Sequence, residues 1–166
     1  MDGGFPPGAP EYFFHLLFQA AHRRDILSDA LLEAVGLNLM QWRVLAVARR
    51  IENCTMTSLA RYSGSERTTL TRTVDQLVER ELVTRWIPDS DRRQVNLAVT
   101  EAGESHYAAA SSVMRARNSR TLVRINPKRL RDATRFLQQL LQGVIEDDAI
   151  SRDLLNFGRP AGAPRP

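Results

Sequence analysis

The sequence predicts a mainly α-helical protein with one small β-hairpin near the middle of the chain. Apolar residues recur at helical spacing over long stretches at both ends. Between these stretches, two shorter helical segments are separated by a turn that contains Gly64, as in a helix-turn-helix. Two short runs rich in β-branched and aromatic residues follow, joined by a charged turn that begins at Pro88. We therefore expect a helix-turn-helix with a hairpin beside it and long helices on either side.

The N-terminal part of the chain predicts a long helix within residues 10–35. Its apolar residues lie near helical spacing, and Gly36 is suited to end it. Residues 1–9 are rich in glycine and proline, so they are predicted to form a disordered arm.

A second helix is predicted to begin after Asn38. Asn38 is a suitable N-cap, and Gln41 stands where the reciprocal side chain of a capping box belongs. Trp42, Val44 and Leu45 are expected to supply the buried face of this helix.

The helix-turn-helix is predicted from the segment TSLARYS, the turn at Gly64, and the segment ERTTLTRTVDQLVERELV. The second segment carries one apolar stripe opposite a polar face, formed by Leu70, Val74, Leu77 and Val78. The strand-like runs LVTRWIP and QVNLAV come directly after it. A helix-turn-helix followed by such a hairpin is a winged helix, and the charged turn is the tip of its wing.

Two more helices are predicted within residues 101–150. Thr100 is the expected N-cap of one that runs to about Arg120, and Asn126 followed by Pro127 starts the other. Residues 157–166 resemble the N-terminal arm in composition and are predicted to be a disordered tail.

Composition narrows the functional classes. No apolar run reaches the roughly 20 residues of a membrane span, and the N-terminus lacks the early basic residues of a secretory signal. One cysteine, Cys54, excludes an internal disulfide framework and a structural zinc site. The sequence contains no phosphate-binding loop and no nucleophile motif. We therefore expect a cytoplasmic protein that is not an enzyme and has no cofactor, no metal site and no membrane partner.

Three segments, in order and at the right spacing, resemble the MarR family of bacterial regulators. The wing signature of that family is Asp-x-Arg, then five residues, then Leu-Thr. Here it stands as Asp91-Arg92-Arg93, then Gln94 to Ala98, then Val99-Thr100. The segments GLNLMQWRVL and TSLARYSGSERTTLTRTVDQLVERELVTR resemble the family's second helix and its helix-turn-helix with the first wing strand. The resemblance covers roughly Glu11 to Val144.

The chain departs from the family pattern at two positions in the helix-turn-helix. Ser65 stands where a small apolar residue usually packs the turn. Glu81 stands where glycine is frequent, so the recognition helix must end without a glycine cap. Neither change removes a DNA-contacting group.

The resemblance implies that residues 36–100 form a winged helix-turn-helix that binds double-stranded DNA. The end of a recognition helix that enters the major groove is its N-terminal half. The predicted DNA contacts on the helix and the wing are Arg67, Thr68, Thr69, Thr71, Arg72, Asp91, Arg92 and Arg93. One wing arginine is expected to enter the minor groove while Asp91 holds the other, and which does which stays open.

The resemblance also implies a homodimer whose long helices, within residues 10–35 and 101–150, interlock across a two-fold axis. Such a dimer reads a pseudo-palindromic site and, in many family members, is released from it by a small aromatic acid. The residues predicted to bind this ligand are His15, Trp42, Arg43 and Arg85. The alternative is that Trp42 belongs to the core and that the other three are ordinary surface residues. Cys54 has no neighbouring lysine or arginine to lower its pKa, which favours a structural role over redox sensing.

The sequence thus predicts a dimeric, ligand-responsive transcriptional regulator, most simply a repressor. The alternative is a winged helix that mediates protein–protein contact without sequence-specific DNA binding, because the fold alone does not impose DNA binding. The net charge over residues 61–93 is only about +1 by count, so affinity would depend on positioned contacts and on two copies acting together.

Overall fold

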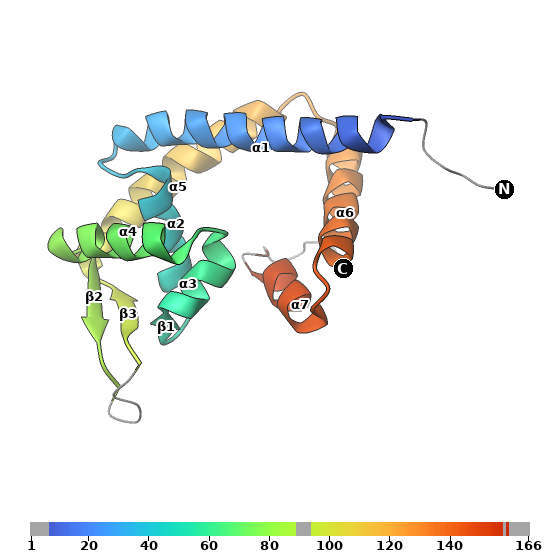
Figure 1. The fold of residues 1–166 in the computed structure, drawn as a ribbon. Helices are drawn as coiled ribbons and strands as arrows, with labels where there is room; N and C mark the ends of the chain where they lie inside the picture. The colour runs from blue at the N-terminus through green and yellow to red at the C-terminus, as the bar shows by residue number, and fades with distance from the viewer. Residues whose placement is uncertain (1–6, 89–93, 158, 160–166) are drawn as a thin grey trace. The chain divides into compact units, whose positions relative to one another are not determined.

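The computed structural model describes residues 7–88, 94–157 and 159 of the 166-residue chain. Figure 1 shows the described helices and strands, coloured from the N-terminus to the C-terminus. Their bounds are α1 (Ala9–Glu33), α2 (Leu39–Ala48), β1 (Cys54–Thr55), α3 (Met56–Ser63), α4 (Arg67–Glu79), β2 (Val83–Trp86), β3 (Asn96–Val99), α5 (Glu101–Leu122), α6 (Pro127–Val144) and α7 (Asp148–Asn156). The predicted fold class, mainly helical with a small hairpin, is confirmed.

The chain divides into two compact units, residues 1–115 and residues 116–166. The core of the first unit lies between α2, α3, α4 and the sheet, where most of the largest buried side chains gather: Val44, Leu45, Leu59, Leu70, Val74, Leu77, Val83 and Leu97. The stripe predicted on the recognition helix is therefore the buried one, with Val78 only half-buried at its margin. Burying this stripe against α2 and α3 determines which face of α4 points outward.

The wing is part of a three-stranded antiparallel sheet with strand order β1-β3-β2. β2 and β3 pair in register from Val83 opposite Val99 to Trp86 opposite Asn96. The two-residue strand β1 is the third strand and forms the edge next to β3, with Cys54 opposite Leu97. The sequence does not predict it, because it is too short to show alternation.

The predicted helix starts are confirmed. Asn38 and Gln41 form a complete capping box at α2, and the Thr100 hydroxyl accepts a hydrogen bond from the Gly103 amide at 3.0 Å where α5 begins. In the second unit, Asn126 caps α6 through the Lys128 amide at 2.8 Å. α7 extends beyond the predicted helices, and its start is held by Asp147, whose carboxylate accepts hydrogen bonds from the amides of Ala149 and Ile150.

The long helices carry apolar side chains that the described part of the chain leaves exposed. In α1 the only buried residues are Ser28 and Leu32. No described residue of α6 is buried, although Phe136 and Leu137 lie on its apolar stripe. None of the helices in the described part of the chain combines the length and the apolar composition that a membrane span requires.

Candidate nucleic-acid interface and the adjoining groove

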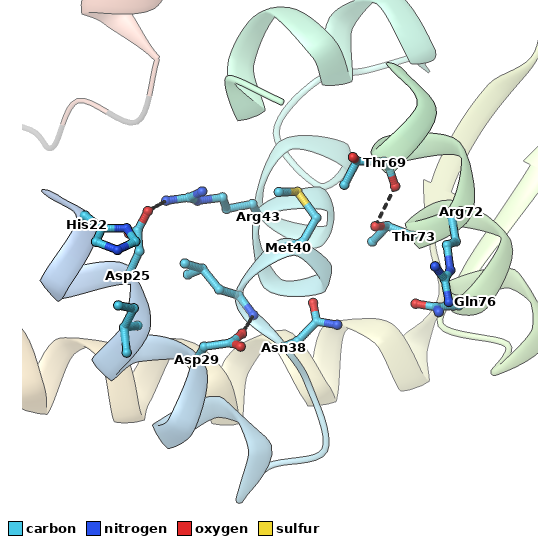
Figure 2. A pocket seen from close by; sticks show the side chains of 12 residues that line it. His22, Asp25, Asp29, Asn38, Met40, Arg43, Thr69, Arg72, Thr73 and Gln76 are labelled. Carbon is cyan, nitrogen blue, oxygen red and sulfur yellow. Dashed lines mark hydrogen bonds and ion pairs between the residues drawn. The ribbon is translucent and has the colours of Figure 1, made fainter. Parts of the chain in front are cut away.

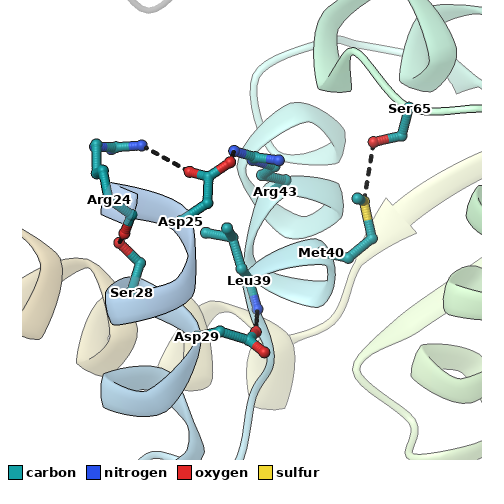
Figure 3. Close-up of polar contacts among 8 residues, drawn as sticks. All are labelled: Arg24, Asp25, Ser28, Asp29, Leu39, Met40, Arg43 and Ser65. Atoms are coloured by element: carbon teal, nitrogen blue, oxygen red, sulfur yellow. Dashed lines mark hydrogen bonds and ion pairs between the residues drawn. The ribbon is translucent and has the colours of Figure 1, made fainter. Parts of the chain in front are cut away.

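α3 and α4 form the helix-turn-helix, and local hydrogen bonds define how it begins and turns. Thr55 caps α3, its hydroxyl accepting from the Ser58 amide at 3.1 Å. Gly64 closes α3 in the left-handed conformation, with φ +66. The hydroxyl of Ser65 donates to the sulfur of Met40 at 3.4 Å, so the polar residue in the turn has a partner on α2 (Figure 3).

The outward face of α4 carries the predicted recognition residues. All five helix residues of that prediction are exposed: Arg67, Thr68, Thr69, Thr71 and Arg72. The hydroxyl of Thr71 donates to the Arg67 carbonyl at 2.9 Å, which leaves its methyl group and an acceptor lone pair for other contacts. The side chains of Arg67 and Arg72 form no hydrogen bond or ion pair with any other described residue. Two guanidinium groups on one exposed helix face therefore have their donors available.

The hairpin approaches the start of α4. Arg67, Gln94 and Val95 lie together around a hollow of about 370 Å³ that Thr55, Met56 and Thr57 complete. The side chain of Gln94 donates to the carboxamide oxygen of Asn96 at 2.7 Å, and Asn96 is buried in the sheet. Asp91, Arg92 and Arg93 lie outside the described residues, so their part in the interface stays a prediction.

A second, larger groove lies between α1, α2 and α4 (Figure 2). Its volume is about 580 Å³. The lining residues are His22, Asp25, Ile26, Asp29, Asn38, Leu39, Met40, Arg43, Thr69, Arg72, Thr73 and Gln76. Ile26, Leu39 and Met40 give it apolar surface, and the remainder is polar or charged. The groove thus joins the recognition helix to the C-terminal half of α1.

Two of the charged side chains in this groove, Asp25 and Arg43, compensate each other (Figure 3). Arg43 pairs with the Asp25 carboxylate at 2.7 Å, and Arg24 approaches the same carboxylate at 3.3 Å. Asp29 accepts a hydrogen bond from the Leu39 amide at 2.7 Å, at the first turn of α2. Arg72 is the one cation lining the groove that has no ionic partner among the described residues.

The structure does not bring the four predicted ligand residues together. Arg43 lines the groove, but His15 is exposed elsewhere on α1, and its neighbour seven residues on, His22, lines the groove instead. Trp42 is half-buried and donates from its indole nitrogen to the Ser111 hydroxyl at 3.1 Å, which ties α2 to α5. Arg85 lies on β2, paired with Asp75 of α4.

The groove residues that sequence reasoning missed do carry a sequence signal. Thr69, Arg72, Thr73 and Gln76 follow the i, i+3, i+4, i+7 spacing of one helix face. This face flanks the buried stripe, so a cleft beside the recognition helix would be lined by it. The α1 contribution has no such signal, because the docking of α1 on α2 depends on tertiary contacts.

A hydrogen-bond network links the groove to the start of α2 and the end of α4. The guanidinium of Arg80 donates to the Gly36 carbonyl at 2.8 Å and to the Gln41 side-chain oxygen at 3.3 Å. The Gln41 amide then donates to Gln76, a groove residue, at 3.3 Å. The capping box of α2 is therefore also the connection between the α1–α2 turn and the recognition helix.

Cys54 lies fully buried on β1 as a free thiol. Desolvation by burial raises its pKa from the ordinary 9.0 to about 11. A thiol that stays protonated at neutral pH is a poor nucleophile, which agrees with the predicted structural role.

Residues 37–95 match the family model described as the MarR family. Among solved structures, the fold matches CouR from Rhodococcus jostii RHA1 bound to p-coumaroyl-CoA, with TM-score 0.69, 25% identity, and coverage of 80% of this chain and 93% of that one. It also matches the Mycobacterium tuberculosis MarR family protein Rv2887 in complex with p-aminosalicylic acid, with TM-score 0.64, 22% identity and coverage of 82% and 98%. BpsR of Bordetella bronchiseptica, whose DNA binding is regulated by 6-hydroxynicotinic acid, gives TM-score 0.72, 18% identity and coverage of 84% and 99%. The comparisons indicate no enzyme family.

Proposed function

We propose that the protein is a dimeric DNA-binding transcriptional regulator of the MarR type, because residues 37–95 match the MarR family model and the fold is similar to that of CouR. In its simplest form it is a repressor that leaves a pseudo-palindromic operator when a small aromatic acid binds. The single observation that carries the proposal is the exposed face of α4. It holds Arg67 and Arg72, which have no hydrogen bond or ion pair with another described residue, and Arg67 lies near Gln94 and Val95 of the hairpin. In a helix-turn-helix, the N-terminal half of the second helix enters the major groove of DNA.

The chemistry of the exposed face suits base and phosphate recognition. Arg67 and Arg72 have guanidinium groups that can bind guanine in the major groove through two hydrogen bonds, and threonine methyl groups suit the methyl of thymine. Neither arginine is needed for packing, since both are exposed, so their presence on this face is explained by an anionic partner better than by folding. Asp91, Arg92 and Arg93 complete the proposed contact at the wing.

Dimerisation accounts for the apolar side chains left exposed on the long helices. Tyr12, Phe14 and Phe18 of α1 are 64%, 49% and 62% exposed in the single chain. Several aromatic residues on one helix are unusual in contact with water, and they indicate a protein interface. A two-fold dimer would also place two recognition helices on two half-sites, which offsets the nearly neutral charge of each winged helix.

The ligand is proposed to be a small aromatic carboxylate. Proteins of similar fold bind p-aminosalicylic acid and p-coumaroyl-CoA, and the DNA binding of a third is regulated by 6-hydroxynicotinic acid. The groove of this chain offers apolar contacts from Ile26, Leu39 and Met40 and an uncompensated guanidinium from Arg72. These groups are suited to an aromatic ring that bears a negative charge.

Selection of binding sites from random double-stranded DNA tests the proposal. The parent protein should enrich one pseudo-palindromic sequence, whereas a winged helix used for protein contact alone would enrich none. Replacing Arg92 and Arg93 by alanine should weaken binding to that sequence and reduce the salt dependence of log K by about 0.9 for each phosphate that is no longer bound. If the folded double variant binds DNA with unchanged affinity and salt dependence, the wing arginines do not contact DNA. Substituting Arg67 should change which bases are preferred, if that side chain reaches a base edge.

A further inference from the structure

The positive charge of the chain is concentrated in its second unit. Residues 1–115 contain 13 arginines and 14 acidic residues, a net charge of −1, although they include the whole winged helix. Residues 116–166 contain 10 arginine or lysine residues and 5 acidic ones, a net charge of +5. The net charge of +4 for the whole chain is therefore due to the unit that does not contain the recognition helix.

Six of the ten cations of this unit lie in the segment 116–131, around the turn between α5 and α6 (Figure 1). This basic cluster consists of Arg117, Arg120, Arg124, Lys128, Arg129 and Arg131. Arg117 is half-buried, and the other five residues are exposed. None of the six side chains forms a hydrogen bond or an ion pair with another residue in the part of the chain that the structure describes.

The acidic residues of the same unit do not neutralise the basic cluster. The nearest in sequence, Asp132, approaches Arg135 at 3.8 Å. Residues 146–148 are all acidic, but they follow the end of α6, and a helix of 18 residues is roughly 27 Å long. That length is about three Debye lengths at physiological ionic strength, so the attraction between these charges is screened.

The chemistry of the basic cluster suits phosphate groups. Arg117, Arg120 and Thr121 line a hollow of about 340 Å³ and share one face of α5. The hydroxyl of Thr121 donates to the Arg117 carbonyl at 3.2 Å, so the donors available in this hollow are the two guanidinium groups. A guanidinium binds a phosphate through two parallel hydrogen bonds, and five of the six cations are arginine.

The residues between the cations distinguish among phosphate-bearing partners. From Arg115 to Thr121 the only apolar residue is Ala116, so this part of α5 has no apolar face to insert into a lipid surface. α6 does carry an apolar stripe, but the proposed dimer would cover it. Residues 108–135 contain no aromatic side chain on which the bases of a single strand could stack. These absences favour the phosphates of a duplex.

We propose that the basic cluster is a second DNA-binding surface, which binds the phosphates of double-stranded DNA without reading its sequence. Duplex DNA carries one negative charge per roughly 1.7 Å of its axis, and cations that neutralise phosphates release the counterions condensed there. The inference goes beyond the proposed function, in which α4 and the wing read the operator. A regulator bound to its operator through the winged helices can then hold a second duplex through the basic cluster.

The first arm of the test measures binding of the full-length protein to a fluorescent duplex of random sequence, at salt concentrations from about 50 to 200 mM. Arg117→Gln/Arg120→Gln/Arg124→Gln should reduce the slope of log K against log salt by roughly 2–3, since each lost phosphate contact accounts for about 0.9. Lysine at the same three positions should retain most of the slope, because the charges remain. The matched control replaces by glutamine three exposed arginines outside the cluster and the winged helix, Arg23, Arg24 and Arg152. This control should leave the slope unchanged.

The second arm tests for two duplexes on one protein. The operator that the protein selects is fixed on beads, loaded with protein and washed, and the fluorescent random duplex is then added. The parent and the control should retain the random duplex. The glutamine triple variant should not retain it, although it should select the same operator. An unchanged salt slope in the folded triple variant, or a parent protein that retains no random duplex on its operator, would overturn the inference.

Vesicles that contain phosphatidylglycerol test the lipid alternative. If the basic cluster is required for binding to these vesicles but not to the random duplex, the surface binds membranes and the DNA inference is wrong. The proposed function fails in a different way, since the protein would then select no operator. The salt dependence of binding to the random duplex would still decide whether the basic cluster binds DNA.

Discussion

At the scale of single residues, Glu81 adopts a backbone conformation that a side chain disfavours, and Cys54 lies in a site that disfavours its ionised form. Glu81 ends α4 with φ +56, in the left-handed region. The Leu82 amide donates back to the Leu77 carbonyl and the Glu81 amide to the Val78 carbonyl, each at 2.9 Å, which is the Schellman pattern usually built around glycine. α4 therefore ends as a glycine-capped helix does, with a glutamate in the glycine position. Cys54 holds its thiol in a buried site that disfavours the thiolate.

Replacing Glu81 by glycine should stabilise the protein. A side chain in the left-handed conformation costs roughly 1–2 kcal/mol, and the greater backbone entropy of unfolded glycine offsets part of that gain. We expect a net increase of about 0.5–1 kcal/mol in the free energy of unfolding, measured by urea denaturation. Glu81→Ala removes the same side chain but keeps Cβ, so it should show no comparable gain. If alanine and glycine stabilise equally, the effect comes from the glutamate side chain and the backbone argument is wrong.

Cys54 should make stability depend on alkaline pH. The folded pKa of about 11 lies above the ordinary 9.0, so below pH 9 the thiol is protonated in both states and its contribution is fully present. Between pH 9 and 11 the unfolded chain releases the proton first. The free energy of unfolding should therefore fall over that window by roughly 2–3 kcal/mol. Cys54→Ala should lose this part of the pH dependence, while the contribution of tyrosines remains in both proteins. Equal slopes in parent and variant would contradict the assignment.

At the scale of elements, the contact between α5 and the base of the wing depends on one glycine. A Cβ at Gly103 would lie 2.1 Å from the Leu82 carbonyl oxygen and 2.7 Å from a Val99 methyl group. Thr100 forms two hydrogen bonds beside this contact. Its amide donates to the Leu82 carbonyl at 3.1 Å, and its hydroxyl donates to the Glu81 carbonyl at 2.7 Å. The start of α5, the end of α4 and the first residues of the hairpin are thus held against one another, which positions the wing beside the recognition helix.

Gly103→Ala should destabilise the winged-helix unit. The added methyl group meets backbone, which cannot rotate away as a side chain can, so α5 must shift from the hairpin, at an expected cost of about 1–3 kcal/mol. Gly143→Ala is the control. It lies within α6 with nothing within 4 Å of the added Cβ, and it should stabilise by about 0.5–1 kcal/mol through helix propensity. Thermal denaturation of both variants measures the difference. A Gly103→Ala protein as stable as the parent would show that the contact is not tight.

At the scale of the whole molecule, the described helices of both units have exposed apolar side chains. In the first unit this surface lies on α1, and in the second on α6, where Phe136, Leu137 and Val144 are exposed. Amphipathic helices of this length are stabilised by packing of the apolar face, because propensity alone does not maintain them. The proposed two-fold dimer supplies that packing and presents two recognition helices together.

Phe14→Asp should dissociate the dimer. The side chain is 49% exposed in the single chain, so the substitution would be nearly neutral for a monomer but would place a carboxylate in an apolar interface of the dimer. We expect dimerisation to weaken by at least about 2 kcal/mol, seen as a shift toward monomer in analytical ultracentrifugation. A Phe14→Asp protein that sediments as the parent does would exclude this face from the interface.

The sequence by itself determined the parts of this protein that depend on local chemistry. Capping residues such as Asn38 with Gln41, and Thr100, act within three residues of themselves, so their spacing alone predicted the helix starts. The stripe that includes Leu70 and Val74 predicted which face of the recognition helix is buried, and hence which residues are exposed. Periodicity reports burial reliably when a helix has one apolar face.

Only the tertiary structure decided which residues share a groove. Arg85 and Asp75 are ten residues apart in the sequence, yet the packing of β2 against α4 joins them in an ion pair, and Arg85 does not line the groove. The docking of α1 against α2 places Asp25 on Arg43, and this compensation leaves Arg72 as the groove's unpaired cation among the described residues. Charge compensation depends on distances across elements, and a sequence contains no such distances. That is why the exposure of the recognition-helix residues was predictable from the sequence while the partners of the charged residues were not.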